Sequence, residues 1–322
     1  MGDIIASSAI VTAFRKAGFS VTFVCFDRYS EIAHNIGASS VVTVSSKTKL
    51  ATIMSLIRFT AHCMFNRYFL CFCFHRRANI FQWFCLFSFA KFRFGFSDSK
   101  LNLYNKSSKY DILTNRTVQE INLVKKAGLP LSFPRNLFFK SSGNFQFDIN
   151  SSKKFITVSL GGGNFLSPIG NRQWPVEHYI SLMKALVVRF EIVLVGSGSQ
   201  DEIISRMVEE KVHVTNFVGK LTVGETAEII SSSVFFIGND SGLSYVAAGV
   251  GATTIVLFGP TSPRLALPYG DNCFALSGEV KCQPCYDPKL GKKSMMYLCN
   301  KNICMQNLLP EDVINQINIM FK

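Results

Sequence analysis

Acidic residues are scarce in this sequence, because 21 Asp and Glu stand against 34 Lys and Arg and leave a net charge of +13. The shortage of acidic residues lies in the first half. Residues 1–150 contain 19 Lys and Arg and 7 Asp and Glu, a net charge of 19 − 7 = +12, whereas residues 151–322 contain 15 and 14, a net charge of 15 − 14 = +1. One interpretation of this positive charge is that it keeps the protein soluble, but charge that serves solubility would be expected in both halves of the chain. The N-terminal half is therefore expected to meet an anionic partner: nucleic acid, anionic lipid headgroups or a phosphorylated saccharide. Nucleic acid ranks lowest, since no recognised nucleic-acid-binding module is present.

Three phosphate-binding signatures are also missing. Gly196-Ser197-Gly198 is followed by Asp201 at the place where the dinucleotide fingerprint needs a third glycine. There is no Walker A pattern, and no Asp-x-Asp to hold a metal and a diphosphate. A diphosphate bound by this chain is therefore expected to rest on backbone amides and on cationic side chains such as Arg172.

Neither a secretory signal nor a membrane span is expected. Met1 to Phe14 lacks a basic start and a cleavage site of small residues, which predicts a cytoplasmic location. In the Phe- and Cys-rich region 53–96, the longest run without a charged residue or His is Ala78 to Ala90, too short to cross a bilayer. Because Arg and Lys interleave with Phe there, this region is expected either to lie against a membrane face or to supply a buried helix and strand.

Helical and strand patterns alternate along the first half. Helices are expected over residues 7–17, 29–36 and 116–127, and strands over 20–25 and 40–44, which indicates a parallel sheet with helical crossovers. A sheet of this kind normally opens with a central strand, and no segment before the first helix supplies one. Residues 131–154 have the composition of a connector between two domains.

The second half predicts a doubly wound α/β domain. Strands are expected over residues 154–160, 191–195, 212–217, 234–237, 253–258 and 273–276, and helices over 175–189, 200–210, 222–231 and 310–320. Gly-rich turns follow three of the strands, at 161–163, 196–198 and 238–242. Several such turns at one sheet edge indicate a nucleotide-binding crevice.

The stretch Val234 to Pro263 contains the clearest candidate site. A short buried strand ends at Gly238-Asn239-Asp240-Ser241-Gly242, and a helix begins there, so its first-turn N–H groups can receive a phosphate. The amides of Ser241 and Gly242, together with Thr261, are the expected holders. Two roles stay open for Asp240: it accepts hydrogen bonds from sugar hydroxyls, or it caps the helix without any ligand.

Four of the ten cysteines cluster near the C-terminus, in the pattern Cys282-x2-Cys285-x13-Cys299-x4-Cys304. This spacing is compatible with a structural zinc or iron ion held by four thiolates. The same pattern would also suit free or packing thiols, or a disulfide. A cytoplasmic chain favours reduced thiols.

Six short motifs occur in a fixed order along the chain. They are Met1-Gly2-Asp3 followed by a helix ending Arg15-Lys16-Ala17-Gly18, Asn122 to Pro130, Arg172 to His178, Asp240-Ser241-Gly242-Leu243-Ser244, Phe258-Gly259-Pro260-Thr261, and Cys282-Gln283-Pro284-Cys285. Singly they are weak signals. Together the chain resembles glycosyltransferase family 9, the ADP-heptose:lipopolysaccharide heptosyltransferases, over nearly its whole length, without the first strand that the family has.

The resemblance implies a GT-B architecture, in which two Rossmann-like domains face each other across a cleft. The N-terminal domain, 1–145, would take the acceptor, and the C-terminal domain, 146–322, would take the nucleotide sugar. The last helix, 310–320, is a candidate to pack back on the N-terminal domain. The charge excess of the first half agrees with a phosphorylated lipopolysaccharide core as acceptor.

The resemblance also implies an activity: inverting transfer of a heptose or related sugar from an ADP-sugar to an anionic glycolipid, with no metal needed for the chemistry, at the cytoplasmic face of the inner membrane. Asp3 would be the general base. Arg172 stands where the family usually has Lys on the phosphates, and Tyr245 where many members have His. The donor-binding residues would be Gly162, Gly163, Arg172, Gly196, Gly198, Asp240, Ser241, Gly242, Leu243 and Thr261. The missing strand and Tyr245 leave a second hypothesis, a sugar-nucleotide-binding or scaffold protein with impaired turnover.

Overall fold

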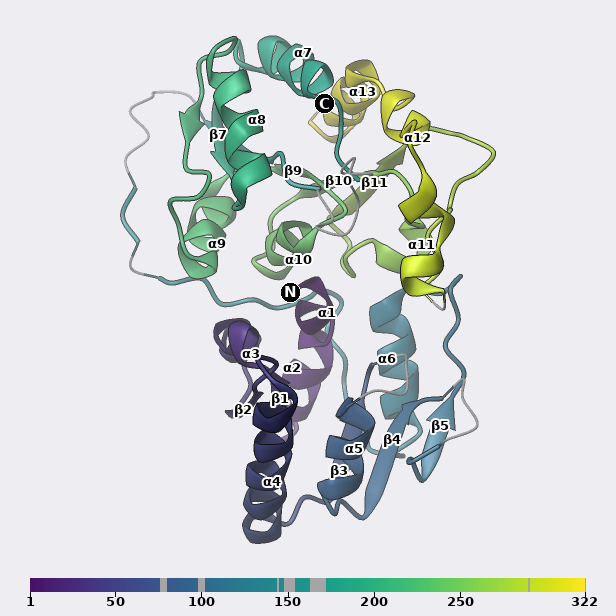
Figure 1. The fold of residues 1–322 in the computed structure, drawn as a ribbon. Coiled ribbons are helices and arrows are strands. Elements are labelled where there is room, and N and C mark those ends of the chain that lie inside the picture. Colours follow the sequence, from purple (N-terminus) through teal and green to yellow (C-terminus); the bar gives the residue numbers. More distant parts are fainter. Residues whose placement is uncertain are drawn as a thin grey trace. The chain divides into compact units, whose positions relative to one another are not determined.

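The computed structural model describes residues 1–75, 80–97, 102–143, 145–147, 154–162, 172–288 and 290–321. These residues form two compact units. Unit 1 holds Met1 and Ser7–Pro134, and unit 2 holds Gly2–Ala6 and Arg135–Lys322. Each unit is an α/β structure with parallel strands, as the sequence predicts (Figure 1).

Unit 1 contains two parallel sheets. β1 (Thr22–Phe26) pairs with β2 (Ser40–Val44), and β4 (Phe92–Phe96) lies between β3 (Leu70–Cys73) and β5 (Lys106–Ser108). A 3-10 turn, η1 (Asp27–Tyr29), follows β1. The helices are α2 (Ser8–Lys16), α3 (Ser30–Asn35), α4 (Lys49–Asn66), α5 (Ile80–Phe87) and α6 (Arg116–Lys125).

The region 53–96, which the sequence leaves open, forms most of α4 and then β3, α5 and β4. Phe59 and Cys63 of α4 pack with Phe84 of α5 and Val44 of β2 in one buried cluster. Burial of this apolar face is the main source of stability for an 18-residue helix. The prediction of a buried helix therefore holds for one face of α4, the face that carries Phe59 and Cys63.

Among the described residues of unit 1, β1 pairs only with β2, and β3 pairs only with β4, so no strand joins the two sheets there. Side chains make the connection: Tyr68 Oη donates a 2.8 Å hydrogen bond to Thr22 Oγ1, and the rings of Phe26 and Phe81 lie 5.1 Å apart. A doubly wound sheet has its central strand at this position. The lack of a first strand stays a prediction from the sequence.

Unit 2 contains one parallel sheet in the order β11-β10-β9-β6-β7-β8. Its strands are β6 (Phe155–Ser159), β7 (Glu191–Val195), β8 (Thr215–Asn216), β9 (Phe236–Asn239), β10 (Thr254–Phe258) and β11 (Cys273–Ser277). The chain runs outward from β6 to β8 and then returns to β9 beside β6. This reversal is the switch point at which α/β sheets bind ligands.

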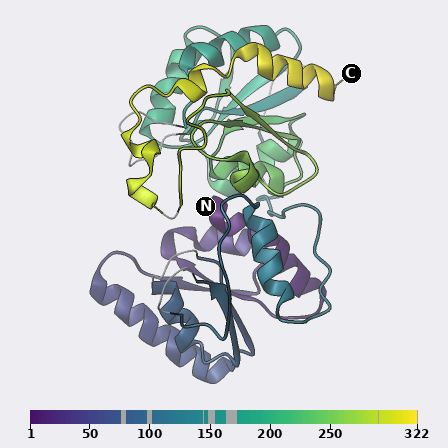
Figure 2. The ribbon, with the colours of Figure 1, turned by 90° about the vertical axis from the view of Figure 1, so that its right-hand side faces the viewer.

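Helices cover both faces of that sheet (Figure 1). One face packs against α7 (Val176–Leu186), α8 (Ser199–Glu209) and α13 (Pro310–Met320) in a single buried cluster that includes Ile156, Leu194 and Leu257. Figure 2 shows α13, in yellow, running beside α7 within the same unit. The other face is covered by α9 (Val223–Ser232) and α10 (Gly242–Gly249). Strands buried on both faces account for the nearly continuous apolar runs in the sequence.

The segment 135–143 runs along unit 2 in an extended form. Phe139 N–H donates to Gly249 O at 2.8 Å, and Ser142 N–H donates to Gly224 O at 3.1 Å. Gly143 N–H adds a 2.8 Å bond to the Glu228 carboxylate. These bonds attach the first part of the predicted connector to unit 2.

The strand predicted over 212–217 shrinks to the two residues of β8. The side chain of Asn216 bends the chain, because its Oδ1 accepts from Val218 N–H and its Nδ2 donates to Ser205 and Glu209. Such a local side-chain bond competes with a strand ladder. Asn216 thus ends the strand one residue early. At the other end, Lys211 N–H and Val212 N–H donate to Val208 O at 2.9 Å, which keeps the chain in the turn after α8 and delays the start of the strand.

The remaining short elements of unit 2 are α1 (Gly2–Ile5), α11 (Pro263–Ala266), α12 (Ile303–Gln306) and two 3-10 turns, η2 (Gly291–Lys293) and η3 (Met295–Leu298). Trp174 holds the C-terminal segment in place, since its indole N–H donates to Leu308 O at 2.8 Å and its ring is buried. No helix among the described residues is long and apolar enough to cross a membrane.

Candidate functional site

The expected strand–turn–helix is present at the start of α10. β9 ends at Asn239, and the Asp240 N–H still donates to Leu257 O of β10 at 3.2 Å. Ser241 is the N-cap of α10 and makes no capping hydrogen bond with its side chain. The first N–H groups of a helix have no partner within the helix. This end of α10 can therefore offer amide donors, and a partial positive charge, to an anion.

The carboxylate of Asp240 does not cap the helix. It is buried, and Thr261 Oγ1 donates to its Oδ2 at 2.6 Å. Arg172 Nη1 lies 3.6 Å from the same oxygen, so the negative charge has a cationic partner. The capping role considered for Asp240 is thus wrong, and the repulsion between this carboxylate and an incoming phosphate is reduced.

Arg172 joins three parts of the site. Its Nη1 also donates to Asp240 O at 3.3 Å, and its guanidinium lies 5.6 Å from the centre of the Tyr286 ring. Its Nε is buried and has no hydrogen-bond partner among the described residues. The buried N–H is a donor that a ligand oxygen can use.

Two further buried polar atoms beside Asp240 have no hydrogen-bond partner in the described part of the chain: Ser241 Oγ and Asn239 Oδ1. The amide nitrogen of Asn239 is fully used, since it donates to Leu160 O, Gly161 O and Tyr179 Oη at 3.3, 3.1 and 2.8 Å. Asn239 therefore fixes the end of β6 against the end of β9. Three buried polar atoms without hydrogen bonds lower the stability of the fold. A ligand that bonds to these atoms would explain why they are kept.

The structure brings part of the predicted Gly-rich turns to this loop. A Cβ on Gly162 would stand 2.6 Å from Arg172 O and 2.8 Å from Asn239 Nδ2, so only glycine fits there without a shift of these groups. Gly163 lies outside the described residues.

The turn that contains Gly196 and Gly198 lies beside a carboxylate, which approaches Gly196. Both glycines have positive φ, 150° and 118°, and they turn the chain from β7 into α8. A Cβ on Gly196 would lie 3.1 Å from Asp201 Oδ2. Burial raises the pKa of Asp201 to about 6, against the opposing effect of a hydrogen bond from the Ser197 N–H. An ionised Asp201 would repel a phosphate, so this turn suits a neutral, hydrogen-bonding part of a ligand better.

Asp3 belongs to the same unit as the α10 loop. It lies on α1, is exposed, and α1 packs against α10 (Figure 1). The contact is close, because a Cβ on Gly2 would lie 2.9 Å from Cδ2 of the Tyr245 ring. Tyr245 is buried, and its hydroxyl donates to Ala266 O at 2.9 Å. The structure thus places the predicted base on the helix beside the predicted donor loop.

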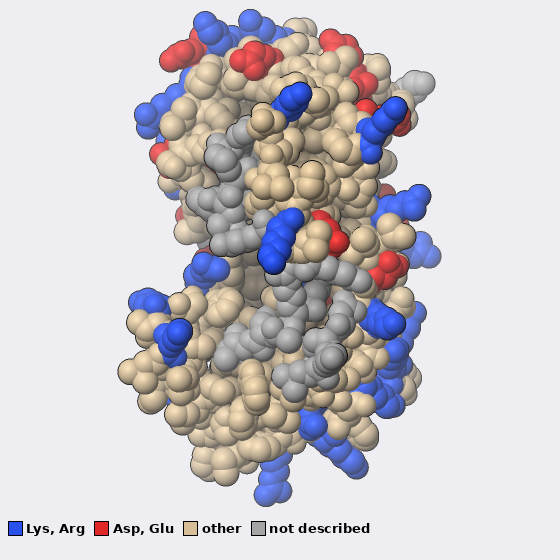
Figure 3. Space-filling model, turned by 45° about the vertical axis from the view of Figure 1, so that its right-hand side comes forward, with Lys and Arg blue, Asp and Glu red and all other residues tan. Residues whose placement is uncertain are grey.

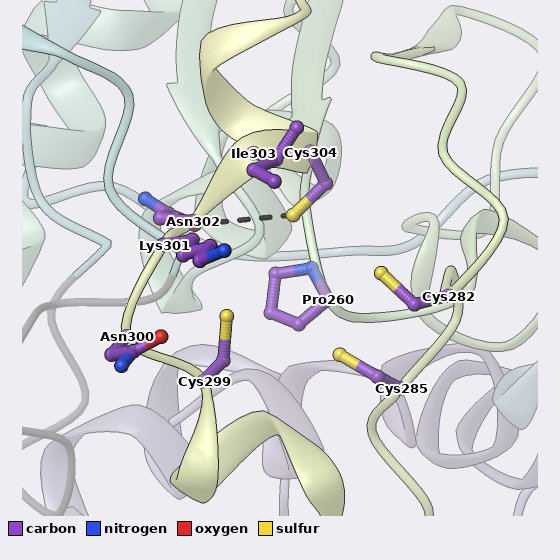
Figure 4. Close-up of a pocket in the computed structure, with 9 residues that line it drawn as sticks. All are labelled: Pro260, Cys282, Cys285, Cys299, Asn300, Lys301, Asn302, Ile303 and Cys304. Atoms are coloured by element: carbon purple, nitrogen blue, oxygen red, sulfur yellow. Dashed lines mark hydrogen bonds between the residues drawn. The ribbon is translucent and has the colours of Figure 1, made fainter.

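The four C-terminal cysteines share one cavity of about 190 Å³. Figure 4 shows Cys282, Cys285, Cys299 and Cys304 around this space, with Pro260 between them. Cys285 N–H and Tyr286 N–H both donate to Pro260 O at 3.0 Å, which ties the cysteine loop to the turn that carries Thr261. All four thiols are free. Burial raises the pKa of Cys285, and it raises the pKa of Cys304 to about 11, which favours the neutral thiols.

The fit of these cysteines to a metal ion can be judged from their placement. In the described ranges, no three His, Cys, Asp or Glu side chains are grouped so that they could hold one ion. The side chains as placed line a shared cavity and do not fit a tetrahedral site. Zinc or iron at Cys282–Cys304 stays a prediction without support from this geometry.

Two residues of the site are not predicted from the sequence. Asn239 and Tyr286 are absent from the predicted donor-binding residues, although Asn239 lies beside Gly162 and the Tyr286 ring lies beside Arg172. A signal exists for Asn239, because it is a polar residue placed directly after a buried strand at a sheet edge. None exists for Tyr286, whose ring meets Arg172 only through folding of the cysteine loop.

Parallel α/β units with a helix start of this kind define a broad class of nucleotide-binding folds. Residues 89–294 match the model of glycosyltransferase family 9 (heptosyltransferase). Because the match covers more than half of the chain, the protein belongs to that family.

Relatives and solved structures agree with this assignment. Lipooligosaccharide heptosyltransferase 2 of Haemophilus influenzae is 33% identical over 106 residues, which is 31% of each chain. In that alignment the chain spans about a third of the length of its curated relative. A family 9 glycosyl transferase of Veillonella parvula superposes with a TM-score of 0.75 at 18% identity, covering 98% of this chain and 92% of that one. The E. coli ADP-heptose lipopolysaccharide heptosyltransferase II superposes with a TM-score of 0.73 at 17% sequence identity, covering 99% of this chain and 95% of that one. These two superpositions show the same fold.

Proposed function

We propose that this protein transfers a heptose, or a closely related sugar, from an ADP-sugar to a lipopolysaccharide core acceptor. Membership of family 9 supports sugar transfer. The solved relative from E. coli is titled an ADP-heptose lipopolysaccharide heptosyltransferase, and the relative from H. influenzae is a lipooligosaccharide heptosyltransferase. These names give the donor and acceptor classes to test first.

The observation that carries the proposal is the group of unsatisfied polar atoms at the start of α10. Arg172 Nε, Ser241 Oγ and Asn239 Oδ1 are buried without partners among the described residues. They lie beside the helix amides of Gly242 and Leu243, where a diphosphate would be stabilised. Arg172 would contact the phosphates, and the Thr261 hydroxyl would orient Asp240 toward the sugar.

In the proposed reaction, an acceptor hydroxyl attacks the anomeric carbon from the side opposite the diphosphate. A bond forms between the hydroxyl oxygen and that carbon, the bond from the carbon to the phosphate oxygen breaks, and ADP leaves with the electron pair. Asp3 takes the hydroxyl proton. Attack opposite the leaving group inverts the anomeric centre. A positioned base contributes about 10²- to 10⁴-fold to such a step.

We propose that this chemistry needs no metal cofactor. The charge that develops on the leaving diphosphate would be stabilised by the Arg172 guanidinium and by the first amides of α10. Transfer should therefore persist in excess EDTA. Loss of activity in EDTA, restored by a divalent cation, would contradict this part of the mechanism.

The acceptor is proposed to be anionic and glycolipid in nature. The N-terminal half carries +12 of the +13 net charge, which favours a phosphorylated saccharide there and peripheral contact with the cytoplasmic face of the inner membrane. Nucleic acid is not proposed as a partner, since no recognised nucleic-acid-binding motif occurs in the sequence.

The test is sugar transfer by the purified chain. ADP-heptose and a heptose-deficient lipopolysaccharide core are incubated with the protein, and the glycosylated product and released ADP are both measured. Product formation with one ADP per sugar is expected. ADP release without an acceptor would indicate different chemistry on the same architecture.

The second candidate is a sugar-nucleotide-binding or scaffold protein with impaired turnover. The two separate sheets of unit 1 favour it, because among the described residues β1 pairs only with β2 and β3 only with β4. Calorimetric binding of ADP-heptose without detectable transfer to any core acceptor would support this candidate. Transfer by the purified chain would exclude it.

A further inference from the structure

Helix α4 of unit 1 exposes a stripe of large apolar side chains. The exposed fractions reach 69% for Leu50, 56% for Ile57 and 89% for Phe65. Ile53, Met54 and Met64 are also exposed. Burying such side chains against a partner is favourable, whereas leaving a row of them in water is unusual for a monomer.

These residues lie on one side of the helix. At about 100° per residue, positions 50, 53, 54, 57, 64 and 65 fall within an arc of roughly 120°. Phe59 and Cys63, on the opposite side, are buried in the cluster that holds α4 to the rest of unit 1. The exposed stripe is therefore not needed for packing α4 onto its own unit.

Cationic side chains flank the stripe. Lys47 and Lys49 lie at the start of α4, Arg58 in its middle and Arg67 just after its end, and all four are exposed. No Asp or Glu occurs anywhere between Glu31 and Asp98, a stretch that contains eight Lys and Arg. Figure 3 shows many blue and few red side chains over the lower part of the drawn surface.

We propose that α4 is a membrane-docking helix, which lies flat in the headgroup region of an anionic lipid bilayer with its apolar stripe toward the acyl chains. An apolar face bordered by Lys and Arg is the pattern of interfacial helices. Eighteen residues give a length of about 27 Å, ample for a contact in the membrane plane. The neighbouring helix α5 also exposes Trp83, a residue type favoured at that interface.

A second copy of the chain is the competing occupant of this stripe. Two α4 helices packed stripe to stripe would bring Lys49, Arg58 and Arg67 of each copy toward the cations of the other. An anionic membrane would neutralise the same charges. Charge complementarity therefore favours lipid.

The first test measures co-sedimentation of the full chain with phosphatidylethanolamine vesicles containing phosphatidylglycerol, and with neutral phosphatidylcholine vesicles. Binding to the anionic vesicles, weakened by salt, is expected. The double variant Ile53→Glu, Ile57→Glu should lower the bound fraction about tenfold or more. The matched control is Val188→Glu, which changes an even more exposed apolar residue of unit 2 and should bind as the wild type does.

A second variant leaves the stripe apolar. Phe65→Trp should show a blue-shifted emission on anionic vesicles and quenching by brominated lipids, whereas Val188→Trp should show neither. An unchanged Phe65→Trp spectrum, or full vesicle binding by a folded Ile53→Glu, Ile57→Glu variant, would overturn the proposal. So would a stripe-dependent dimer, detected by light scattering, that does not bind vesicles. Vesicle binding needs neither donor nor acceptor, so its failure is distinguishable from a failure of sugar transfer.

Discussion

Thr261 donates a 2.6 Å hydrogen bond to the carboxylate of Asp240, across the space between the loops that follow β10 and β9. Both residues are buried. With Arg172 on the same carboxylate oxygen, this pair holds Asp240 away from the helix N-cap. The start of α10 is thereby kept open to an anion.

Removing the Thr261 hydroxyl should weaken the site. Thr261→Val leaves the Asp240 carboxylate with fewer donors, at a cost of about 1–3 kcal/mol in the free energy of unfolding. ADP affinity should fall as well. Thr261→Ser keeps the hydroxyl and should restore most of both quantities. Urea unfolding and calorimetry on the two variants measure this, and equal behaviour of Val and Ser at the position would show that the hydrogen bond is unimportant.

Arg172 should matter more for the donor than for the fold. Arg172→Ala removes the cationic partner of the diphosphate and should lower ADP-sugar affinity about tenfold to a hundredfold. Arg172→Lys keeps a point charge and should lose less. The matched control, Arg189→Ala, removes an exposed Arg of unit 2 that bonds to Asn318, and should leave affinity unchanged. Equal affinities of the Ala variant and the wild type would remove Arg172 from the donor site.

Asp3→Asn tests the proposed base. The amide cannot take the hydroxyl proton, so kcat should fall about 10²- to 10⁴-fold. Donor binding, measured by calorimetry, should stay unchanged because Asp3 does not hold the diphosphate in this mechanism. Full transfer by the Asn variant would show that another group takes the proton.

Asp201 predicts a particular dependence of stability on pH. Burial raises the pKa of its carboxyl to about 6, from 3.8 in the unfolded chain. Since the folded-state pKa is raised, the stabilising contribution is complete below about pH 3.8 and is lost as pH rises through about 6. After allowance for partial exposure, the loss is about 1–2 kcal/mol.

The comparison is the wild type against Asp201→Asn, by urea unfolding between pH 4 and pH 7. The Asn variant cannot ionise, so its stability relative to the wild type should increase across this range. Asp271→Asn, at an exposed acid of the same unit, serves as the control. A constant difference between wild type and Asp201→Asn would contradict the raised pKa.

The placement of the four cysteines around their cavity predicts how much metal the purified protein contains. Because no three of its thiols are grouped to hold one ion, the purified chain should contain well below one zinc or iron per molecule. Thiol titration should find Cys282 reactive and Cys304 slow, as their exposures differ. One tightly bound ion per chain, lost in Cys285→Ser and Cys299→Ser, would mean that metal binding rearranges this loop.

Local sequence patterns predict a helix or strand well where the pattern of apolar, polar and turn-forming residues allows only one placement of the element. β2, β7 and α13 have the predicted bounds. The apolar run 191–195 is bounded by non-strand residues at both ends, so a strand can be placed there in only one way. Pro310 is favourable in the first turn of a helix and marks the start of α13. The strand–turn–helix around Asp240 follows for the same reason.

Long-range contacts could not be predicted in this way. The role of Asp240 depends on Arg172 and Thr261, which approach it only in the folded sheet. The contact of Tyr286 with Arg172 and the carboxylate of Asp201 beside Gly196 are also tertiary. The exposed face of α4 is ambiguous in the sequence because both of its faces are apolar, and only burial of Phe59 and Cys63 separates them.

A crystal structure with bound ADP tests the central claim most directly. The account predicts the diphosphate within hydrogen-bonding distance of Ser241 Oγ, Arg172 Nε and the first amides of α10. A diphosphate bound instead at the Gly196–Gly198 turn, or no ADP at the start of α10 at saturating concentration, would contradict it.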